Sequence, residues 1–351
     1  MDLPDRYEQT GKPLDGGMGS VIPCRDKILS RSVAIKIVHG TANRRRMLDE
    51  LGALAKMRSK HVVQVFDVLQ PAPSELGIVQ EFIDGKDLFD DDTKPVSTTD
   101  LYKQLWQIAS GISDIHALGV IHRDIKPNNM KIDPEGVLKI FDFGLARDEG
   151  PAAATTGFVG TRGFAAPELY YGPVRFTAAV DTYAFGATAL YIATRDLTNE
   201  LMEQPPKFSG DSYFDNTEYA IADEIVDMLD SCLSENPANR PKMSDVRDIL
   251  SRHILHDRHR ALVVFQGKAS YLHAGNRSVN LTLLPLGQVA IHYDGLNFKV
   301  GALTPEVFIN NKRIAVGDVL PGSCVVALGG AEHGNRRRYI TFDLSHPEFV
   351  L

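Results

Sequence analysis

The sequence is poor in cysteine, in tryptophan and in long hydrophobic runs. Its 351 residues include one tryptophan and three widely separated cysteines, Cys24, Cys232 and Cys324. An odd number of distant cysteines with no Cys-x-x-Cys pair indicates neither a disulfide framework nor a zinc site. We therefore expect inert thiols in a reducing cytoplasm. The most apolar helix candidate, residues 183–193, is too short to span a bilayer, so we expect no membrane-spanning segment.

An excess of positive charge is also missing. The chain has 38 Lys and Arg against 45 Asp and Glu, a formal net charge of −7. This balance argues against a general role in binding nucleic acid or anionic membranes. The short basic runs 44–46 and 336–338 are expected to be solvated faces. The start of the chain, residues 1–5, does not have the pattern of a signal peptide, so a cytoplasmic protein is expected.

What the chain does contain is a group of polar residues suited to phosphoryl transfer. Residues 120–147 carry Asp124, Lys126 and Asn129, and Asp142 follows a short apolar pulse just before Gly144. In such a transfer one carboxylate orients the attacking hydroxyl. A second carboxylate and a carboxamide hold Mg²⁺, and a cation neutralises the moving phosphate.

These residues also form two motifs of a known family. His122-Arg123-Asp124-x-Lys126-x-x-Asn129, followed by Asp142-Phe143-Gly144, resembles the catalytic and metal-binding loops of eukaryotic-like Ser/Thr protein kinases, in their bacterial style. The resemblance implies ATP as phosphate donor, Asp124 as general base or hydroxyl orienter, and Lys126 on the γ-phosphate. It implies Asn129 and Asp142 as ligands of Mg²⁺ or Mn²⁺.

A glycine-rich stretch precedes these motifs. Three glycines within four residues let backbone amides approach phosphates, although a hairpin turn explains them as well. With the following run 33–36, the stretch resembles the phosphate-covering loop and lysine strand of kinases, except that Leu14 replaces the first glycine. The ATP-binding residues implied by the resemblance are Gly16, Gly17, Gly19, Val21, Ala34, Lys36, Glu50, Glu81 and Ile83.

Two of these residues are expected to form an ion pair. Lys36 lies in an apolar strand-like run, and Glu50 shares the apolar face of a helix predicted over residues 43–58. A buried charge is costly without a partner, so we predict a Lys36–Glu50 pair. By resemblance, residues 81–83 form the adenine-binding hinge and Gln80 guards the back pocket.

The later part of the family pattern is also present. An amphipathic helix is predicted over residues 99–116, with Thr98 or Thr99 as N-cap, and His122 is expected to be a core residue. Residues 145–168 would form the activation segment. Its candidate phosphorylation sites are Thr155, Thr156 and Thr161, and Arg123 is placed to pair with a phosphate there.

Further expectations come from the resemblance alone. It implies that Thr161 touches Asp124 and Lys126, which favours Ser or Thr as acceptor. It also implies that Asp181 hydrogen-bonds the catalytic-loop backbone and that Arg240 pairs with Glu168. Residues 197–220 depart from the family's usual spelling.

The pattern changes after the basic segment 252–260. Seven short apolar or alternating runs follow, separated by turn signals, and they predict a small all-β sandwich. Residues 307–329 resemble the last strands of forkhead-associated (FHA) domains, which bind phosphothreonine peptides. The usual phosphate-reading residues are absent. The sandwich is therefore either a partner-binding or packing module, or a divergent reader that uses Arg277 or Arg313.

Together these features predict an α+β chain in which a two-lobed protein-kinase fold is followed by an FHA-like all-β sandwich. The kinase domain is expected over residues 7–255, with lobes of about 7–82 and 83–255, and the sandwich over 261–351. The predicted function is ATP- and Mg²⁺-dependent phosphorylation of protein Ser or Thr in signalling, with autophosphorylation. The alternatives are a pseudokinase, acting as a nucleotide-binding switch or scaffold, and a binding module gated by the kinase.

Overall fold

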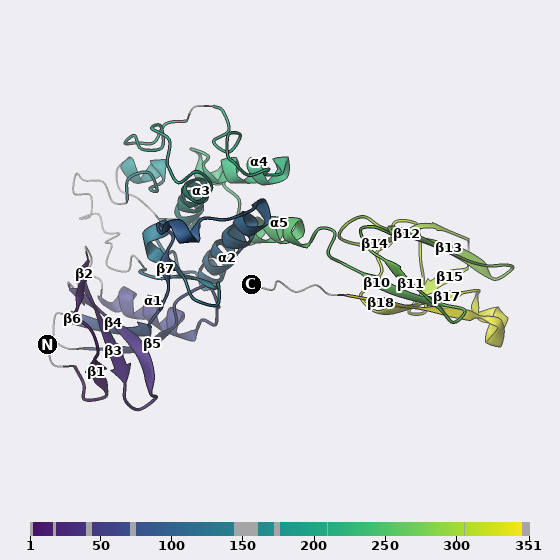
Figure 1. The fold of residues 1–351 in the computed structure, drawn as a ribbon, viewed down its shortest axis with the longest axis horizontal. Coiled ribbons are helices and arrows are strands. Elements are labelled where there is room, and N and C mark those ends of the chain that lie inside the picture. Colours follow the sequence, from purple (N-terminus) through teal and green to yellow (C-terminus); the bar gives the residue numbers. More distant parts are fainter. Residues whose placement is uncertain are drawn as a thin grey trace. The chain divides into compact units, whose positions relative to one another are not determined.

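The computed structural model describes residues 3–16, 19–39, 44–70, 75–143, 161–171, 176–208, 210–304 and 306–345. The chain divides into two compact units, one up to Leu250 and one from Ser251 onward. The first unit is a mixture of helices and strands, and the second consists almost entirely of strands (Figure 1). Each unit is described by itself below.

The first unit begins with a six-stranded sheet. Its strand order is β1-β3-β4-β6-β5, and β2 pairs with β3. All of these neighbours are antiparallel. The elements of this part are β1 (Tyr7–Gln9), β2 (Leu14–Gly16), β3 (Gly19–Asp26), β4 (Arg31–His39), α1 (Arg44–Lys56), β5 (Val65–Leu69) and β6 (Glu75–Glu81).

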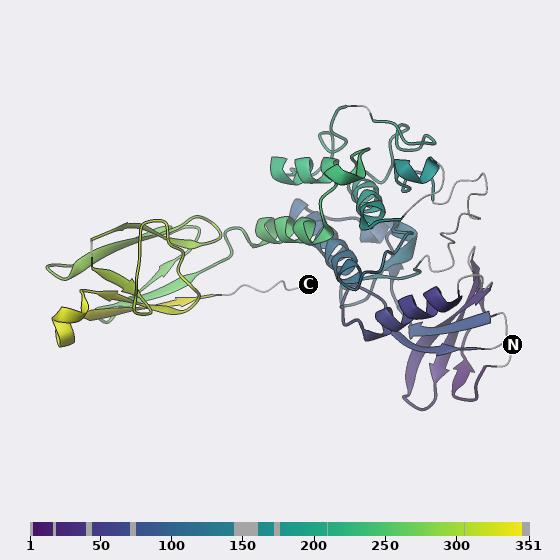
Figure 2. The same cartoon turned by 180° about the vertical axis from the view of Figure 1, so that it is seen from behind.

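Helix α1 covers one face of this sheet, as opposite views show (Figures 1 and 2). The apolar side chains of α1 share a core with residues of β4, β5 and β6, so the stripe predicted from the sequence does face inward. Residues 33–38 of strand β4 are buried because the strand lies between β3 and β6. Lys36 is the one charged side chain in that buried run, with 7% of its surface exposed.

The rest of the first unit is mainly helical. It consists of β7 (Lys86–Asp87), η1 (Asp91–Thr93), α2 (Thr98–Ala117), η2 (Pro127–Asn129), β8 (Met130–Ile132), β9 (Leu138–Ile140), η3 (Pro167–Tyr170), α3 (Ala178–Thr194), α4 (Asp223–Cys232), η4 (Pro237–Asn239) and α5 (Met243–Leu255). Strands β7, β8 and β9 form a small antiparallel sheet. The division between the two units falls within α5.

The start of α2 differs from the prediction by one residue. Ser97, not Thr98 or Thr99, is the N-cap, and its hydroxyl accepts a hydrogen bond from the amide of Asp100 at 3.1 Å. The Asp100 carboxylate in turn accepts from the amide of Val96 at 3.0 Å. This reciprocal arrangement resembles a capping box, which satisfies amides that have no partner inside the helix. Three consecutive hydroxyl residues made the choice of cap ambiguous in the sequence.

Helix α3 is buried on all sides, as its apolar composition predicted. Gly186 allows close packing, because a Cβ atom there would lie 3.0 Å from side-chain atoms of Cys232 and Leu233. Among the described residues, no helix lies between the end of α3 and the start of α4. The sequence that departs from the family's spelling therefore forms turns and irregular backbone.

The second unit contains two antiparallel sheets. One has the order β11-β10-β18-β17-β15-β16 and the other β12-β13-β14. The strands are β10 (Ala261–Phe265), β11 (Lys268–Leu272), β12 (Ser278–Leu283), β13 (Gly287–Tyr293), β14 (Phe298–Leu303), β15 (Val307–Ile309), β16 (Lys312–Arg313), β17 (Cys324–Leu328) and β18 (Arg338–Leu344). The seven predicted runs all became strands. The sequence missed β11 and β16, because neither is apolar.

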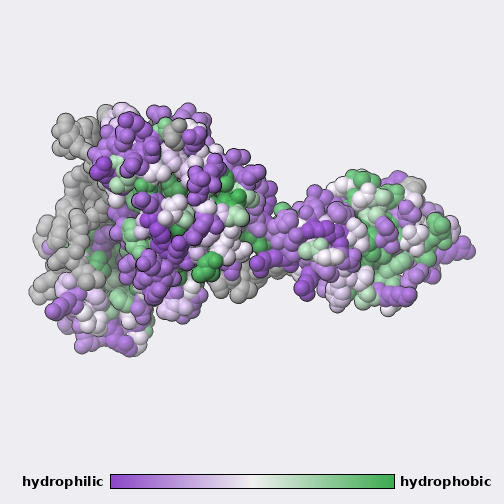
Figure 3. Space-filling view, turned by 45° about the horizontal axis from the view of Figure 1, so that its top comes forward, coloured by the Kyte–Doolittle hydropathy of each residue, from purple (hydrophilic) through white to green (hydrophobic). Residues whose placement is uncertain are grey.

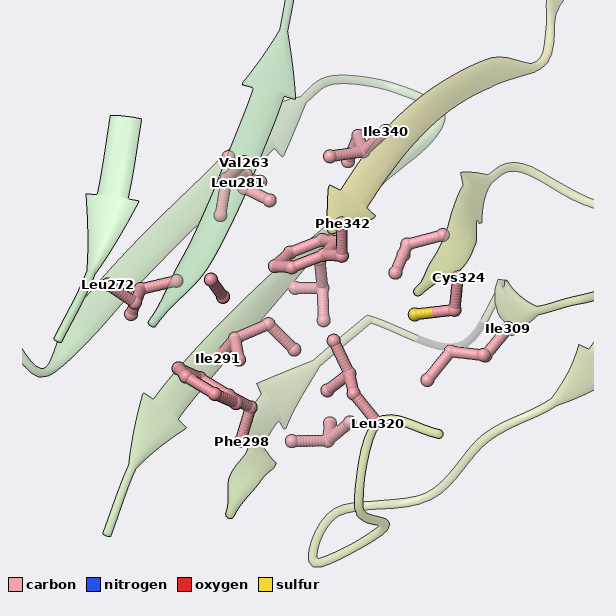
Figure 4. Packing of buried hydrophobic residues seen from close by; sticks show 14 of the residues in the cluster. Val263, Leu272, Leu281, Ile291, Phe298, Ile309, Leu320, Cys324, Ile340 and Phe342 are labelled. Atoms are coloured by element: carbon pink, nitrogen blue, oxygen red, sulfur yellow. The ribbon is translucent and has the colours of Figure 1, made fainter. Parts of the chain in front are cut away.

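Both sheets contribute side chains to one core. Phe342 of β18, Ile291 of β13 and Phe298 of β14 point toward one another between the sheets (Figure 4). Residues next to them along each strand are exposed or half-buried, so burial alternates with the pleat. The surface visible in Figure 3 shows hydrophilic and hydrophobic residues interspersed on this unit. The predicted all-β region is present, and its cause is the alternating pattern.

We expect the two faces of β18 to respond differently to truncation. Phe342→Ala removes a fully buried ring and should cost about 3–5 kcal/mol of the opening free energy of the second unit. Thr341→Ala, on the exposed face of the same strand, should cost less than about 1 kcal/mol. Hydrogen exchange of peptides from residues 261–344, measured in the full chain, tests this. Equal losses in both variants would show that the core is not the source of stability.

Candidate active site

The loop that carries Asp124 is held by the buried carboxylate of Asp181 in α3. Its two oxygens accept hydrogen bonds from the amides of His122 and Arg123, both at 2.8 Å. The ring of His116 in α2 lies 2.9 Å from the same carboxylate. Asp181 thus fixes two consecutive amides, as the family resemblance predicted. Arg123 has a positive φ of 67°, a conformation that an ordinary residue keeps only where its surroundings enforce it.

His122 is a core residue, as predicted, and is fully buried. Its Nε2 lies 3.1 Å from the carbonyl oxygen of Phe141, and its Nδ1 lies 3.3 Å from the amide of Asp124. These contacts assign the proton to Nε2, since the amide must donate to Nδ1. Burial lowers the pKa of His122, so its ring is neutral and links the two loops without acting as a base.

Asp124, Lys126, Asn129 and Thr161 form one hydrogen-bonded cluster. Lys126 Nζ lies 2.9 Å from both Asp124 Oδ2 and Thr161 Oγ1, and Thr161 Oγ1 donates to Asp124 Oδ1 at 3.4 Å. Asn129 Nδ2 donates to Asp124 at both its backbone oxygen (2.7 Å) and Oδ2 (2.9 Å). The contacts predicted for Thr161 are confirmed. A hydroxyl therefore lies within reach of a nearly buried carboxylate and a cation.

The predicted ion pair between Lys36 and Glu50 is wrong for this structure. Lys36 Nζ contacts Asp142 Oδ1, and Glu50 Oε1 accepts from Arg123 Nη2 at 2.8 Å. Each charge is paired, but with a different partner from the one expected. The sequence identified four charged residues of the candidate site, but not which of the possible pairings they adopt. Arg123, predicted to pair with a phosphate, is held by Glu50 here.

Asn129 and Asp142 suit a hard divalent cation. The amide of Phe141 donates to the carbonyl of Asn129 at 2.9 Å, which brings the Asn129 backbone next to the residue that precedes Asp142. The nitrogen of the Asn129 side chain is used by Asp124, so its amide oxygen is the atom left to act as a ligand. Carboxylate and carboxamide oxygens are the ligands that Mg²⁺ prefers, so the donor set fits.

Most of the predicted ATP-binding residues lie in the first sheet and at its end, and Glu50 lies in α1. Gly16 and Gly19 face each other across the β2–β3 hairpin, while Gly17 lies outside the described residues. Lys36 faces Val21 and Ala34 faces Pro23 across β3–β4. The carboxylate of Glu81, at the end of β6, pairs with Lys139 at 2.8 Å.

One hydrogen bond limits which backbone groups of the predicted hinge are available to adenine. The backbone amide of Glu81 donates to the carbonyl of Gln64 at 2.9 Å, so this amide is already used. Ile83 is partly buried and packs against the core that α1 shares with β4, β5 and β6. Thr155 and Thr156 lie outside the described residues.

Glu168 and Arg240 pair as the resemblance implied. Arg240 Nη1 and Nη2 donate to the two oxygens of Glu168 at 2.7 and 2.8 Å. The same guanidinium also donates to the carbonyl oxygens of Ser234, Glu235 and Ala179. A buried, planar fork of this kind fixes both position and orientation. It anchors the segment that follows Thr161 to the helices below it.

Arg277, one of the two arginines considered for phosphate recognition, has a structural role in the second unit. Arg277 Nη2 donates to both carboxylate oxygens of Asp257 at 2.7 Å, and its guanidinium lies 5.6 Å from the ring centroid of Tyr293. Arg277 is therefore engaged within its own unit and has no need of a phosphate. Arg313 lies on the exposed edge strand β16.

Two functional features were missed in the sequence. The bond between His116 and Asp181 was not foreseen, because an isolated histidine in an amphipathic helix gives no signal of its partner. The role of Arg162 was also missed. Arg162 is the residue after Thr161, and its exposed side chain donates from Nε to the carbonyl of Met202 at 2.7 Å. Its position next to Thr161, with no acid nearby in sequence, was the available signal.

The described part of the chain contains no cluster of three or more His, Cys, Asp or Glu arranged to hold a metal. No helix in that same part has both the length and the apolar character needed to cross a membrane.

A carboxylate beside a hydroxyl and a cation, with Asn129 and Asp142 next to them in the chain's fold, is the arrangement expected of a protein kinase domain. The family model "Protein kinase domain" matches residues 7–250, and the chain belongs to this family.

The relatives are animal and bacterial kinases. The chain is 34% identical over 218 residues to cyclin-dependent kinase-like 2 of Oryctolagus cuniculus, covering 60% of this chain and 37% of that protein. The human protein of the same name is also 34% identical, with 42% of it covered. Serine/threonine-protein kinase pkn3 of Myxococcus xanthus is 28% identical over 284 residues, covering 70% of this chain and 51% of that one. The chain spans about half or less of each of these relatives.

We expect Asp181→Asn to destabilise the first unit by about 3 kcal/mol, because two buried amides and His116 lose a charged acceptor. Burial alone would raise the pKa of Asp181, but its bonds to His116 and His122 lower it overall. Its contribution is therefore present above the ordinary carboxyl pKa and is lost as the pH falls below about 4.

Denaturant unfolding of the first unit at several pH values measures this difference. Asp223→Asn is the matched control, since Asp223 is an exposed acid in the first turn of α4. Equal stability of the two variants at neutral pH, or a difference that grows as the pH falls, would contradict the role given to Asp181.

Proposed function

We propose that the protein transfers the γ-phosphoryl group of Mg·ATP to Ser or Thr hydroxyls of proteins. The observation that carries this proposal is the cluster in which a threonine hydroxyl already lies 3.4 Å from Asp124 and 2.9 Å from Lys126. An acceptor hydroxyl has the same chemistry as Thr161. It would find there both a carboxylate that takes its hydrogen bond and a cation for the phosphoryl oxygens.

The transfer itself asks the protein mainly for positioning. The bond between the γ-phosphorus and the bridging β–γ oxygen breaks, and a bond from the acceptor oxygen to the γ-phosphorus forms. The acceptor proton moves to Asp124, and ADP leaves with the bridging electron pair. Lys126 balances negative charge on the phosphoryl oxygens. Asn129 and Asp142 would hold the Mg²⁺ ion, which neutralises phosphate charge when it is bound.

The charge pairs in the structure place one requirement on this reaction. Lys36 and Asp142 neutralise each other, while nucleotide phosphates and metal need each of them separately. Arg123 is likewise occupied by Glu50. We propose that binding of Mg·ATP separates Lys36 from Asp142, and that Glu50 then becomes available to Lys36. Differential affinity of the ligand for the separated state supplies the free energy.

Autophosphorylation is part of the proposal. Thr161 is already used by Asp124 and Lys126, so a phosphate on it would remove contacts that the site depends on. We therefore propose Thr155 and Thr156 as the principal sites. A phosphate there would compete with Glu50 for Arg123, since a dianion binds a guanidinium fork strongly.

Transfer of labelled phosphate from γ-labelled ATP tests the activity. Purified full-length protein with Mg²⁺ should label Thr155 or Thr156 and a generic protein substrate. Asp142→Asn should lower the rate at least about 100-fold, because it removes a metal ligand while keeping the shape of the side chain. Asp223→Asn should retain the wild-type rate.

The alternative is a pseudokinase, a nucleotide-gated switch without turnover. In that case ATP would raise the melting temperature of the protein while no label appeared on the protein or the substrate. That result would overturn the proposed transfer. Label that persists in Asp142→Asn would point to a contaminating kinase.

For the second unit we propose binding of an acidic protein partner through the outer face of its six-stranded sheet. The strand registers place the exposed hydrophobic residues of β10, β11, β17 and β18 on this one face. They are Val264, Tyr271, Val325 and Tyr339, of which Tyr271 and Tyr339 are more than half exposed. An exposed group of this kind on adjacent strands is typical of an interaction surface.

The charges at one end of this face indicate the kind of partner. The guanidinium of Arg337 lies 5.2 Å from the ring centroid of Phe308 and 5.8 Å from that of Tyr339. Arg313 faces Phe308 across β15–β16. Rigid aromatic rings beside arginines favour a partner with apolar and acidic residues.

A labelled peptide of alternating Glu and Leu is the probe for this surface. Its affinity for the full chain should fall about tenfold in Arg337→Glu, and should be unaffected in Lys268→Glu, which lies in the row of β11 that faces the core side. A phosphothreonine version of the peptide distinguishes a phosphate reader. Affinity that requires the phosphate, or that is equal in both variants, would contradict the proposal.

A further inference from the structure

Arg162 presents a cation directly beside the proposed acceptor position. It follows Thr161, whose hydroxyl contacts both Asp124 and Lys126. The side chain of Arg162 is exposed, and its Nε donates to the carbonyl of Met202 at 2.7 Å. This bond uses one of the five donors of the guanidinium and leaves the Nη groups for another partner.

Arg162 differs from the other cations of the site in its pairing. Each of the others has a carboxylate partner: Lys36 has Asp142, Arg123 has Glu50, Lys126 has Asp124 and Arg240 has Glu168. In the part of the chain that the structure describes, no carboxylate lies within ion-pair distance of Arg162. A guanidinium that is fixed by a backbone carbonyl and lacks a counter-charge attracts an anion from outside.

The backbone under Arg162 is held firmly. Gly163 has a φ of 83°, and a Cβ atom there would lie 2.6 Å from Leu197 Cδ1 and 2.7 Å from Met202 Sδ. Only glycine satisfies both conditions without strain, so the segment after α3 packs closely on this turn. The same segment supplies the carbonyl of Met202 that binds Arg162. The irregular stretch between α3 and α4 therefore fixes the position of this cation.

The geometry limits where the anion lies along a bound peptide. Neighbouring Cα atoms are about 3.8 Å apart and an extended arginine side chain adds roughly 7 Å, so the Arg162 guanidinium lies within roughly 13 Å of the Thr161 hydroxyl. An extended peptide advances about 3.5 Å per residue. Counted from an acceptor hydroxyl at Asp124, the reach of Arg162 thus covers the first three residues on either side of the acceptor.

We propose that Arg162 is a specificity-determining residue that selects substrates with an acidic side chain within three residues of the phosphorylated Ser or Thr. The inference rests on the proposed kinase function and names its substrate class. The ligand is an anionic group that accepts two parallel hydrogen bonds from the guanidinium fork. Asp and Glu carboxylates have this chemistry, and so does a residue phosphorylated beforehand.

Steady-state phosphorylation of a peptide series by the full-length protein tests this. Each peptide has one Thr in a neutral background, with Glu placed in turn at each of the three positions before and after it. A parallel set carries phosphoserine in place of Glu and distinguishes a carboxylate from a phosphate as the preferred anion. The readout is the ratio of kcat/KM for an anionic peptide to that for the neutral peptide.

For the wild type, this ratio should be about five to ten at one position or more and should fall as salt is added. It should fall to about one in Arg162→Gln. In Arg162→Glu the preference should reverse toward Lys-containing peptides, a change that loss of a merely structural contact would not produce. Arg25→Glu, an equal change of charge at an exposed position of strand β3, should keep the wild-type ratio.

The outcomes separate this inference from the function it rests on. Phosphorylation of all peptides at similar rates, or an acidic preference that survives in Arg162→Glu, would overturn the role of Arg162 while leaving the kinase function intact. Absence of label on every peptide and on the protein itself would overturn the kinase function, and the inference would fall with it.

Discussion

The arrangement of the candidate site depends on one buried carboxylate. Asp181 lies in a helix that is packed on all sides. Its carboxylate accepts hydrogen bonds from the amides of His122 and Arg123 and from the His116 ring. Since two successive amides share one rigid acceptor, the loop that follows has little freedom. Asp124, Lys126 and Asn129 can then be placed by short-range bonds alone. An interior charge is costly, and here its cost is offset by three donors.

The four charged residues that would lie near a bound nucleotide are not held by a single buried group in this way. Lys36, Glu50, Arg123 and Asp142 form two ion pairs. A bound nucleotide phosphate would compete with Asp142 for Lys36, and a bound metal would compete with Lys36 for Asp142, so binding of these ligands would change the pairing. The loop that carries Asp124 is fixed by Asp181, whereas the pairing of these four charges is open to change. This division suits a site in which the acceptor-binding residues keep one geometry, while catalysis depends on how the four charges are paired.

Much of this could be predicted from the sequence, for reasons that differ between features. The strands of the second unit followed from alternation, because a two-sheet core forces every second side chain inward. The contacts of Thr161, Asp181 and Arg240 followed from motif resemblance, because each is a short local geometry repeated with the motif. The Lys36–Glu50 pairing failed, because partners separated in sequence depend on how the lobes and loops are placed. Strands β11 and β16 were missed, since edge strands need no apolar pattern.

The irregular segment between α3 and α4 supports the proposed role of Arg162 in specificity. A helix in this place would have satisfied its own carbonyls, whereas irregular backbone leaves carbonyls available to neighbours. One of them, from Met202, binds Arg162, and the side chains of Leu197 and Met202 fill the space beside Gly163. The same stretch is tied at its far end, where Tyr219 donates to the carbonyl of Pro95 at 2.7 Å and Glu218 pairs with Lys94. Contacts at both ends let an irregular segment position a charged side chain as firmly as a helix does. A cation placed in this way, next to a hydroxyl-binding carboxylate, adds recognition of charge to recognition of the acceptor.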